Sequence, residues 1–186
     1  IFLNGESDTG GGNGYALDLV FSTPNYFAQF DLSFVASARH TTNVPTGEWH
    51  HIVGTRRSGT SYVYYDGVQA GTTTASAPNT PANRTAIGAR HSAAQGASRF
   101  FNGDIAECGF WNVALDDSDI SAVADGISPI MVRPTSLLSY YPIIGNFSPE
   151  TDKKRATTLT LAGTANVSPH PRIIYPSGVE ARRFTT

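Results

Sequence analysis

Ser61-Tyr-Val-Tyr-Tyr-Asp66-Gly67-Val68-Gln-Ala70 is the stretch that decides the fold of this 186-residue chain. An Asp-Gly pair stands here between two runs rich in β-forming residues. Because both residues of such a pair accept positive φ angles, the pair predicts a two-residue turn between antiparallel strands. The stretch therefore predicts a β-hairpin.

Short apolar runs bounded by turn residues recur on both sides of this hairpin. We expect strands over residues 15–21, 26–35, 49–56, 85–90, 99–111, 137–142 and 157–163. Trp49 is expected to begin a central strand and to anchor the core with its large apolar side chain. Strands at this spacing without intervening amphipathic helices predict an all-β fold, an antiparallel sandwich of two sheets.

One short helix is expected between residues 116 and 125. Asp116 or Asp117 would cap its first amide groups, and Gly126 would end it. Its apolar stripe consists of Ile120, Val123 and Ala124.

The composition excludes several classes of protein. With 13 Lys and Arg against 15 Asp and Glu, the net charge is −2, so the chain lacks the basic excess typical of nucleic-acid binding. No apolar run approaches the roughly 18 residues of a membrane span. Cys108 is the single cysteine, which excludes an intrachain disulfide, and its apolar neighbours predict a buried thiol.

Prolines accumulate after residue 133, and residues 169–186 are expected to form an extended arm that packs on the body or on a neighbouring subunit. Proline fixes an extended backbone and so lowers the entropy lost when such an arm is ordered. The predicted assembly contacts are Pro169, Pro171, Ile173, Ile174 and Tyr175.

Five motifs occur in a characteristic order along the first two thirds of the chain. They are Gly14-Tyr-Ala-Leu, Gly47-Glu-Trp-His-His-Ile-Val, Tyr62-Val-Tyr-Tyr-Asp-Gly-Val, Ala86-Ile-Gly-Ala-Arg, and Phe101-Asn-Gly-Asp-Ile-Ala-Glu-Cys-Gly-Phe-Trp-Asn-Val-Ala-Leu-Asp. In this order they resemble the laminin G-like, concanavalin A-like jelly-roll superfamily found in phage and bacterial proteins. The resemblance implies a jelly-roll body over residues 1–132, followed by additional strands and a Pro-rich arm over residues 133–186.

The chain departs from that family in two places. Family members usually open with a strand reading Tyr-x-Pro and then Leu-x-Gly, and a similar pattern occurs here in residues 138–146 and 159–164. The C-terminal segment is therefore expected either to supply strands to the body or to exchange with a neighbour. Ala106 stands where the family often has Asp beside Glu107, which argues against a family calcium site there.

The carboxylate pattern argues against an enzyme. The superfamily includes glycoside hydrolases, which need two carboxylates roughly 5–9 Å apart in one groove. On a strand that requires i, i+2 spacing, whereas Asp104 and Glu107 lie three residues apart. Asp117 and Asp119 have the spacing, but helix capping explains them.

No cofactor is expected. The alternative considered is a calcium ion held in the Gly-rich loop by oxygen ligands, namely Asn4, Glu6, Asp8 and Asn13. The five histidines are scattered, as packing and surface residues are.

A glycan site would need exposed aromatic rings beside hydrogen-bonding groups. The candidate residues are Tyr26, Tyr64, Tyr65, Arg90 and Trp111. These features favour a non-enzymatic structural or interaction protein of a phage virion, such as a capsid decoration, fibre or tail component on the virion surface. Its partners would be other virion subunits or copies of itself, with no nucleic acid and no membrane. The alternative is an extracellular or cell-surface module that binds polysaccharide.

Overall fold

The Asp66-Gly67 turn is present in the computed structural model of the chain, and it joins strands β6 (Thr60–Tyr65) and β7 (Val68–Thr74). Asp66 has φ 48° and Gly67 has φ 80°, as the predicted hairpin turn requires. Strand β5 (Ile52–Arg57) pairs antiparallel with the other edge of β6. Together they form a three-stranded sheet, β5-β6-β7.

The structure describes residues 2–4, 14–32, 36–77, 85–92, 96–98, 100–145, 148–161 and 166–176. The chain folds as two compact units, unit 1 over residues 1–105 and unit 2 over residues 106–186. The boundary between these units follows residue 105, whereas the sequence predicts the end of the jelly-roll body at residue 132. The end of the jelly-roll body at residue 132 stays a prediction.

Unit 1 contains a second, five-stranded sheet in the order β4-β3-β2-β1-β8. Its central pair is fully antiparallel, with Leu17 opposite Phe30 and Leu19 opposite Ala28. The strands are β1 (Phe2–Asn4), β2 (Tyr15–Ser22), β3 (Asn25–Asp31), β4 (Ser37–Arg39) and β8 (Thr85–Ile87). A separate ribbon joins β9 (Arg90–Ser92) and β10 (Gly96–Ser98).

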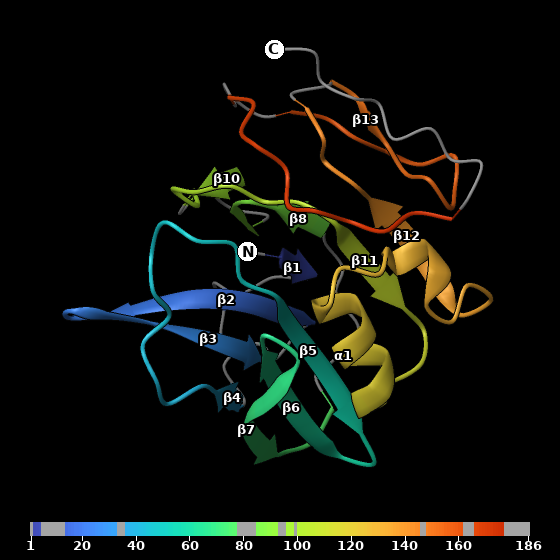
Figure 1. Cartoon of the computed structure of the whole chain (residues 1–186). Coiled ribbons are helices and arrows are strands. Elements are labelled where there is room, and N and C mark those ends of the chain that lie inside the picture. The colour runs from blue at the N-terminus through green and yellow to red at the C-terminus, as the bar shows by residue number, and fades with distance from the viewer. Residues whose placement is uncertain are drawn as a thin grey trace. The chain divides into compact units, whose positions relative to one another are not determined.

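The strands of the two sheets of unit 1 are drawn in Figure 1, and side chains from both sheets form a shared hydrophobic core. Alternate residues of each strand point inward, which is why the core draws on both sheets. Its buried members are Ala28, Phe30, Ala38, Val44 and Val63. The predicted antiparallel two-sheet sandwich is confirmed.

Trp49 is not the core anchor that the sequence predicted. It is 41% exposed and precedes β5, which begins only at Ile52. The ladder between β5 and β6 ends at the pair Ile52–Tyr65. At the next position the His51 amide donates to the Asp66 side chain rather than to a backbone carbonyl, while the His51 carbonyl accepts the Asp66 amide. Residue 49 therefore lies in a loop rather than in a strand.

Unit 2 is built on the antiparallel pair β11 (Cys108–Trp111) and β12 (Leu137–Tyr141). The strand predicted over residues 99–111 is thus much shorter than expected, because Glu107 adopts φ 58° and interrupts an extended backbone. The C-terminal segment contributes β12 to this pair, within unit 2, and its contribution to the jelly-roll body stays a prediction. The remaining elements are η1 (Pro129–Met131), β13 (Glu150–Thr151) and β14 (Thr158–Leu159).

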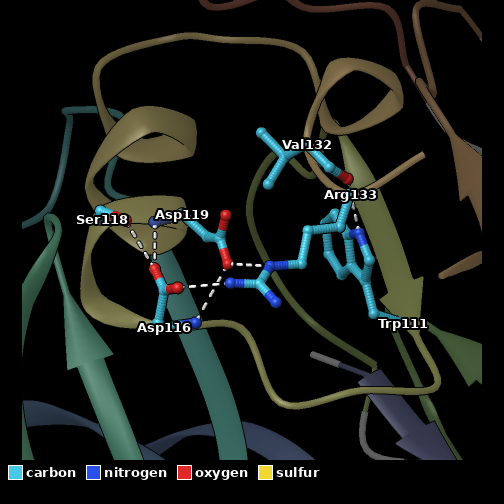
Figure 2. A network of polar contacts seen from close by, with 6 residues as sticks. All are labelled: Trp111, Asp116, Ser118, Asp119, Val132 and Arg133. Atoms are coloured by element: carbon cyan, nitrogen blue, oxygen red, sulfur yellow. Dashed lines mark hydrogen bonds and ion pairs between the residues drawn. The ribbon is translucent and has the colours of Figure 1, made fainter. Parts of the chain in front are cut away.

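Helix α1 (Asp117–Ala124) confirms the predicted helix, with Asp116 as its N-cap. The Asp116 carboxylate accepts the Asp119 amide, while the Asp119 side chain accepts the Asp116 amide, a reciprocal capping box. Arg133 donates to both carboxylates (Figure 2). Hydrogen bonds from Ser118 and the Asp119 backbone, together with nearby Arg133, lower the pKa of Asp116 to about 2.

The other end and the packing face of α1 also follow the prediction. Ile120 is completely buried, and Gly126 follows the helix with φ 91°, a conformation that glycine adopts without strain. Because the Asp119 and Asp116 carboxylates serve the helix and Arg133, they are committed to structure.

Candidate functional site

The 40–51 loop, which joins β4 to β5, is a largely exposed segment that the sandwich of unit 1 fixes at both ends (cyan in Figure 1). At its start, the His40 amide donates to the Ala28 carbonyl over 2.8 Å. The Val44 amide donates to the Tyr26 carbonyl over 2.8 Å, and the Tyr26 amide donates to Asn43 Oδ1 over 2.9 Å. These bonds hold residues 40–44 beside β3.

The end of the loop is held by the hairpin turn that the sequence predicted. The His51 amide donates to Asp66 Oδ1 over 2.8 Å, and the Asp66 amide donates to the His51 carbonyl over 2.8 Å. His50 Nδ1 lies 2.9 Å from Asp66 Oδ2 and 2.7 Å from the Tyr65 hydroxyl. His40 stacks on the other side of the network, with its ring centroid 4.7 Å from that of Tyr65.

Between these two anchored ends, residues 45–49 are all exposed. They include Trp49 and Glu48, directly before the network of His50, Tyr65 and Asp66. Loops held on a rigid scaffold commonly carry binding residues. The loop therefore carries an exposed tryptophan one residue before the network of His50, Tyr65 and Asp66.

A second exposed aromatic group lies at the tip of the β2–β3 hairpin. Phe21 is 57% exposed and Tyr26 is 37% exposed, and their ring centroids are 5.0 Å apart. Since the Tyr26 backbone is bonded to Asn43 and Val44, this pair adjoins the start of the 40–51 loop.

Burial and the Asp66 charge shift the pKa values of three residues in and around the network, His40, His51 and Tyr65. Burial lowers the pKa of His51 to about 4, against the opposing effect of Asp66, and burial likewise lowers the pKa of His40. Burial and the nearby Asp66 carboxylate raise the pKa of Tyr65 to about 12. At neutral pH, His51 is therefore neutral and the Tyr65 phenol keeps its proton.

The predicted glycan residues fall into different environments. Tyr26 is exposed and Tyr65 belongs to the network, so the structure brings both to the ends of the 40–51 loop. Tyr64 is only 1% exposed and receives a hydrogen bond from Arg57, so its buried ring offers no platform to a sugar. The Arg90 side chain lies outside what the structure describes.

Trp111, the last of those candidates, lies in unit 2. Its indole N–H donates to the Val132 carbonyl over 2.9 Å, beside the Arg133 network (Figure 2). Its polar edge is thus occupied within its own unit. The glycan role of this set stays a prediction, and Trp49 is the exposed aromatic that the sequence had assigned to the core.

The predicted assembly arm is attached to its own unit. Ile174 forms a parallel bridge with Ile127, and the Tyr175 hydroxyl donates to Glu107 Oε1 over 2.9 Å. Pro169, Pro171 and Ile173 belong to the same described stretch, 166–176, while residues 177–186 lie outside the described part. A contact with neighbouring subunits stays a prediction.

The structure bears on the metal and thiol predictions in part. Glu6, Asp8 and Asn13 of the calcium alternative, and the side chain of Asn4, lie outside the described residues. Elsewhere in the described ranges, no three His, Cys, Asp or Glu side chains gather as a metal ion would require. Burial raises the pKa of Cys108 to about 12, so the thiol stays protonated.

Neither described helix has the length and apolar character that crossing a membrane takes.

Comparison with known sequences gives one family match. Residues 1–121 match the family described as the concanavalin A-like lectin/glucanases superfamily. No curated protein matches the chain.

Among solved structures, an S-layer domain-containing protein from Clostridium thermocellum ATCC 27405 (residues 221–444) is similar at 18% identity with a TM-score of 0.38. The match covers 63% of this chain and 64% of that one.

Proposed function

Because this chain belongs to the concanavalin A-like lectin/glucanase superfamily, we propose that it is a non-enzymatic module that recognises surface polysaccharide, working outside the cell or on a particle surface. The binding site is the 40–51 loop together with its neighbours Tyr26, Tyr65 and Asp66. The supporting observation is the exposed Trp49, carried on a segment whose two ends are bonded to the sandwich.

The chemistry of the loop suits a sugar ring. An indole presents an apolar face against which the C–H face of a sugar packs. The half-exposed Asp66 carboxylate accepts hydrogen bonds from sugar hydroxyl groups. Because both ends of the loop are fixed, little conformational entropy is lost when a ligand binds.

The carboxylates of unit 2 support a function without catalysis. Asp116 and Asp119 bind the helix start and Arg133, and both Glu107 oxygens accept hydrogen bonds from tyrosines. A glycoside hydrolase needs one carboxyl group as acid and another as base or nucleophile. Carboxylates held in this way serve structure.

Affinity electrophoresis through gels containing bacterial surface polysaccharides tests the proposal. At least one polysaccharide is expected to retard the protein, and Trp49→Ala is expected to weaken that binding about tenfold or more, as the loss of a central aromatic contact does. The matched control is Phe100→Ala. Phe100 is 64% exposed, as a matched control requires. The amide of the next residue, Phe101, donates to the Gly88 carbonyl just after β8, so Phe100 lies near the edge of the five-stranded sheet that is opposite β4 and the 40–51 loop. Equal weakening by both variants would contradict the assigned site.

A second candidate is a structural component of a phage virion, such as a decoration, fibre or tail protein. Large apolar side chains that stay exposed on unit 2 favour it, because assembly contacts cover such groups. They are Val113, Met131, Leu161, Val167 and Ile174.

Sedimentation velocity over a wide concentration range tests the second candidate. Assembly through the arm predicts oligomers that Ile174→Ser weakens, because Ile174 is 50% exposed and its bridge with Ile127 uses only backbone atoms. Val68→Ser, at a 70% exposed position of unit 1, is the control. A monomer at every concentration would contradict assembly and leave polysaccharide recognition as the function.

A further inference from the structure

The C-terminal arm is held to unit 2 by a short backbone pairing. The Ile174 amide donates to the Gly126 carbonyl over 2.7 Å, and the Ser128 amide donates to the Ile174 carbonyl over 3.0 Å. Two hydrogen bonds make a small attachment for residues 166–176, so side chains have to secure the arm as well.

Glu107 supplies the side-chain attachment. Its Oε2 accepts the Tyr140 hydroxyl of β12 over 2.7 Å, and its Oε1 accepts the Tyr175 hydroxyl of the arm over 2.9 Å. His170 Nε2, also from the arm, lies 3.2 Å from the same Oε1. With only 9% of its side chain exposed, Glu107 is a buried carboxylate that two arm residues contact.

The contacts of His170 define its protonation state. Nδ1 lies 2.8 Å from the Pro171 carbonyl oxygen, while Nε2 faces Glu107 Oε1 and, over 3.3 Å, the Pro142 carbonyl oxygen. All three partners are acceptors only, so both ring nitrogens have to carry a proton. A neutral imidazole would turn one lone pair toward an acceptor oxygen.

We propose that His170 and Glu107 form a pH-sensitive latch, which holds residues 170–175 against residues 126–128 while the imidazole carries both protons and loosens when it loses one. The loss removes one charge-assisted hydrogen bond and leaves the buried carboxylate without its cation. The loosened arm uncovers the backbone groups of Gly126 and Ser128.

The other groups around the latch do not titrate with it. Burial and the Glu107 charge raise the pKa of both Tyr140 and Tyr175 well above the ordinary value, so these phenols remain donors. Ser128 donates to the Tyr140 hydroxyl over 3.2 Å, and the Cys108 thiol stays protonated. His170 is thus the group that changes near neutral pH.

The direction of the effect follows from the pKa of His170. Burial lowers it, but the hydrogen bonds to Glu107, Pro171 and Pro142 and the Glu107 charge outweigh burial and raise it above 6.5. A raised histidine pKa stabilises the folded state below about pH 6.5, and this stabilisation is lost as the pH rises through the folded-state pKa.

Hydrogen exchange on the full chain, normalised to the intrinsic rate at each pH, tests the latch. The Ile174 and Ser128 amides are expected to be about tenfold better protected at pH 5.5 than at pH 8.5, the effect of one hydrogen bond to a charged group. In His170→Gln the pH dependence should disappear, whereas the control His40→Gln should retain it. Equal protection of the unmodified protein at both pH values, or an unchanged pH dependence in His170→Gln, would overturn the proposal.

Discussion

Gly71→Ala is expected to lower the free energy of unfolding of unit 1 by about 3 kcal/mol, the upper range for overpacking a core. Gly71 lies in β7, where a β-carbon would stand 2.2 Å from the carbonyl oxygen of Arg39 in β4. The Arg39 oxygen belongs to the backbone, and the backbone of residue 71 fixes the position of the β-carbon, so no side-chain rotation relieves the overlap. The edge strands of the two sheets would have to separate.

Urea unfolding of the Trp111→Phe background measures this effect, because Trp49 then remains as the only one of the two tryptophans and reports unit 1. Gln69→Ala is the matched control, since Gln69 is an exposed residue of the same strand. A midpoint for Gly71→Ala equal to that of Gln69→Ala would show that the two edges do not approach as described.

Unit 1 is expected to lose about 3 kcal/mol of stability between pH 6.5 and pH 4 through His51 alone. The unfolded histidine binds a proton near pH 6.5, whereas burial holds the pKa of folded His51 near 4. A lowered pKa means that stability is full above pH 6.5 and declines as the pH falls toward the folded-state value, by about 1.4 kcal/mol per pH unit.

The difference between the unmodified protein and His51→Gln isolates this contribution, since every other titrating group is common to both. Urea unfolding at several pH values should show a shallower acid decline in the variant. The His170→Gln variant is the histidine control and should keep the full decline of unit 1. Parallel curves for the unmodified protein and His51→Gln would mean that His51 is not buried in its neutral form.

Features with short-range causes could be predicted from the sequence. The hairpin needed only Asp66 and Gly67, and the helix needed an acidic cap and an apolar stripe that contains Ile120. The two-sheet sandwich followed from strand spacing. For the hairpin and the helix, the residues that decide the structure lie within one or two turns of each other.

The misplaced features depend on residues far apart in the chain. Trp49 was expected in the core, but the strand begins later because Asp66, 15 residues beyond His51, bonds the His51 amide. The two tyrosines that donate to Glu107 lie 33 and 68 residues away, so no local sequence pattern indicates its role. Ala106 stands where the family often has Asp, and this difference argued only against a calcium site. It did not predict that the neighbouring Glu107 binds the arm.

The buried Tyr64 illustrates a further limit. Tyr64 and Tyr65 are adjacent in a strand, so they point to opposite faces. Tyr65 shares the face of Val63 and packs against the hydrophobic core of the sandwich, whereas Tyr64 is buried on the opposite face, where Arg57 bonds its hydroxyl. One of two equivalent-looking tyrosines therefore reaches the candidate site, while the other is fully buried.

The emission of Trp49 in the Trp111→Phe variant tests polysaccharide recognition most directly. Phenylalanine keeps an aromatic ring at residue 111 and removes the indole N–H that bonds Val132. Titration with the polysaccharide that retards the protein should shift Trp49 emission to the blue and protect it from acrylamide, with the same dissociation constant as the gel measurement. Saturation of binding with the emission and acrylamide quenching of Trp49 unchanged would contradict the account.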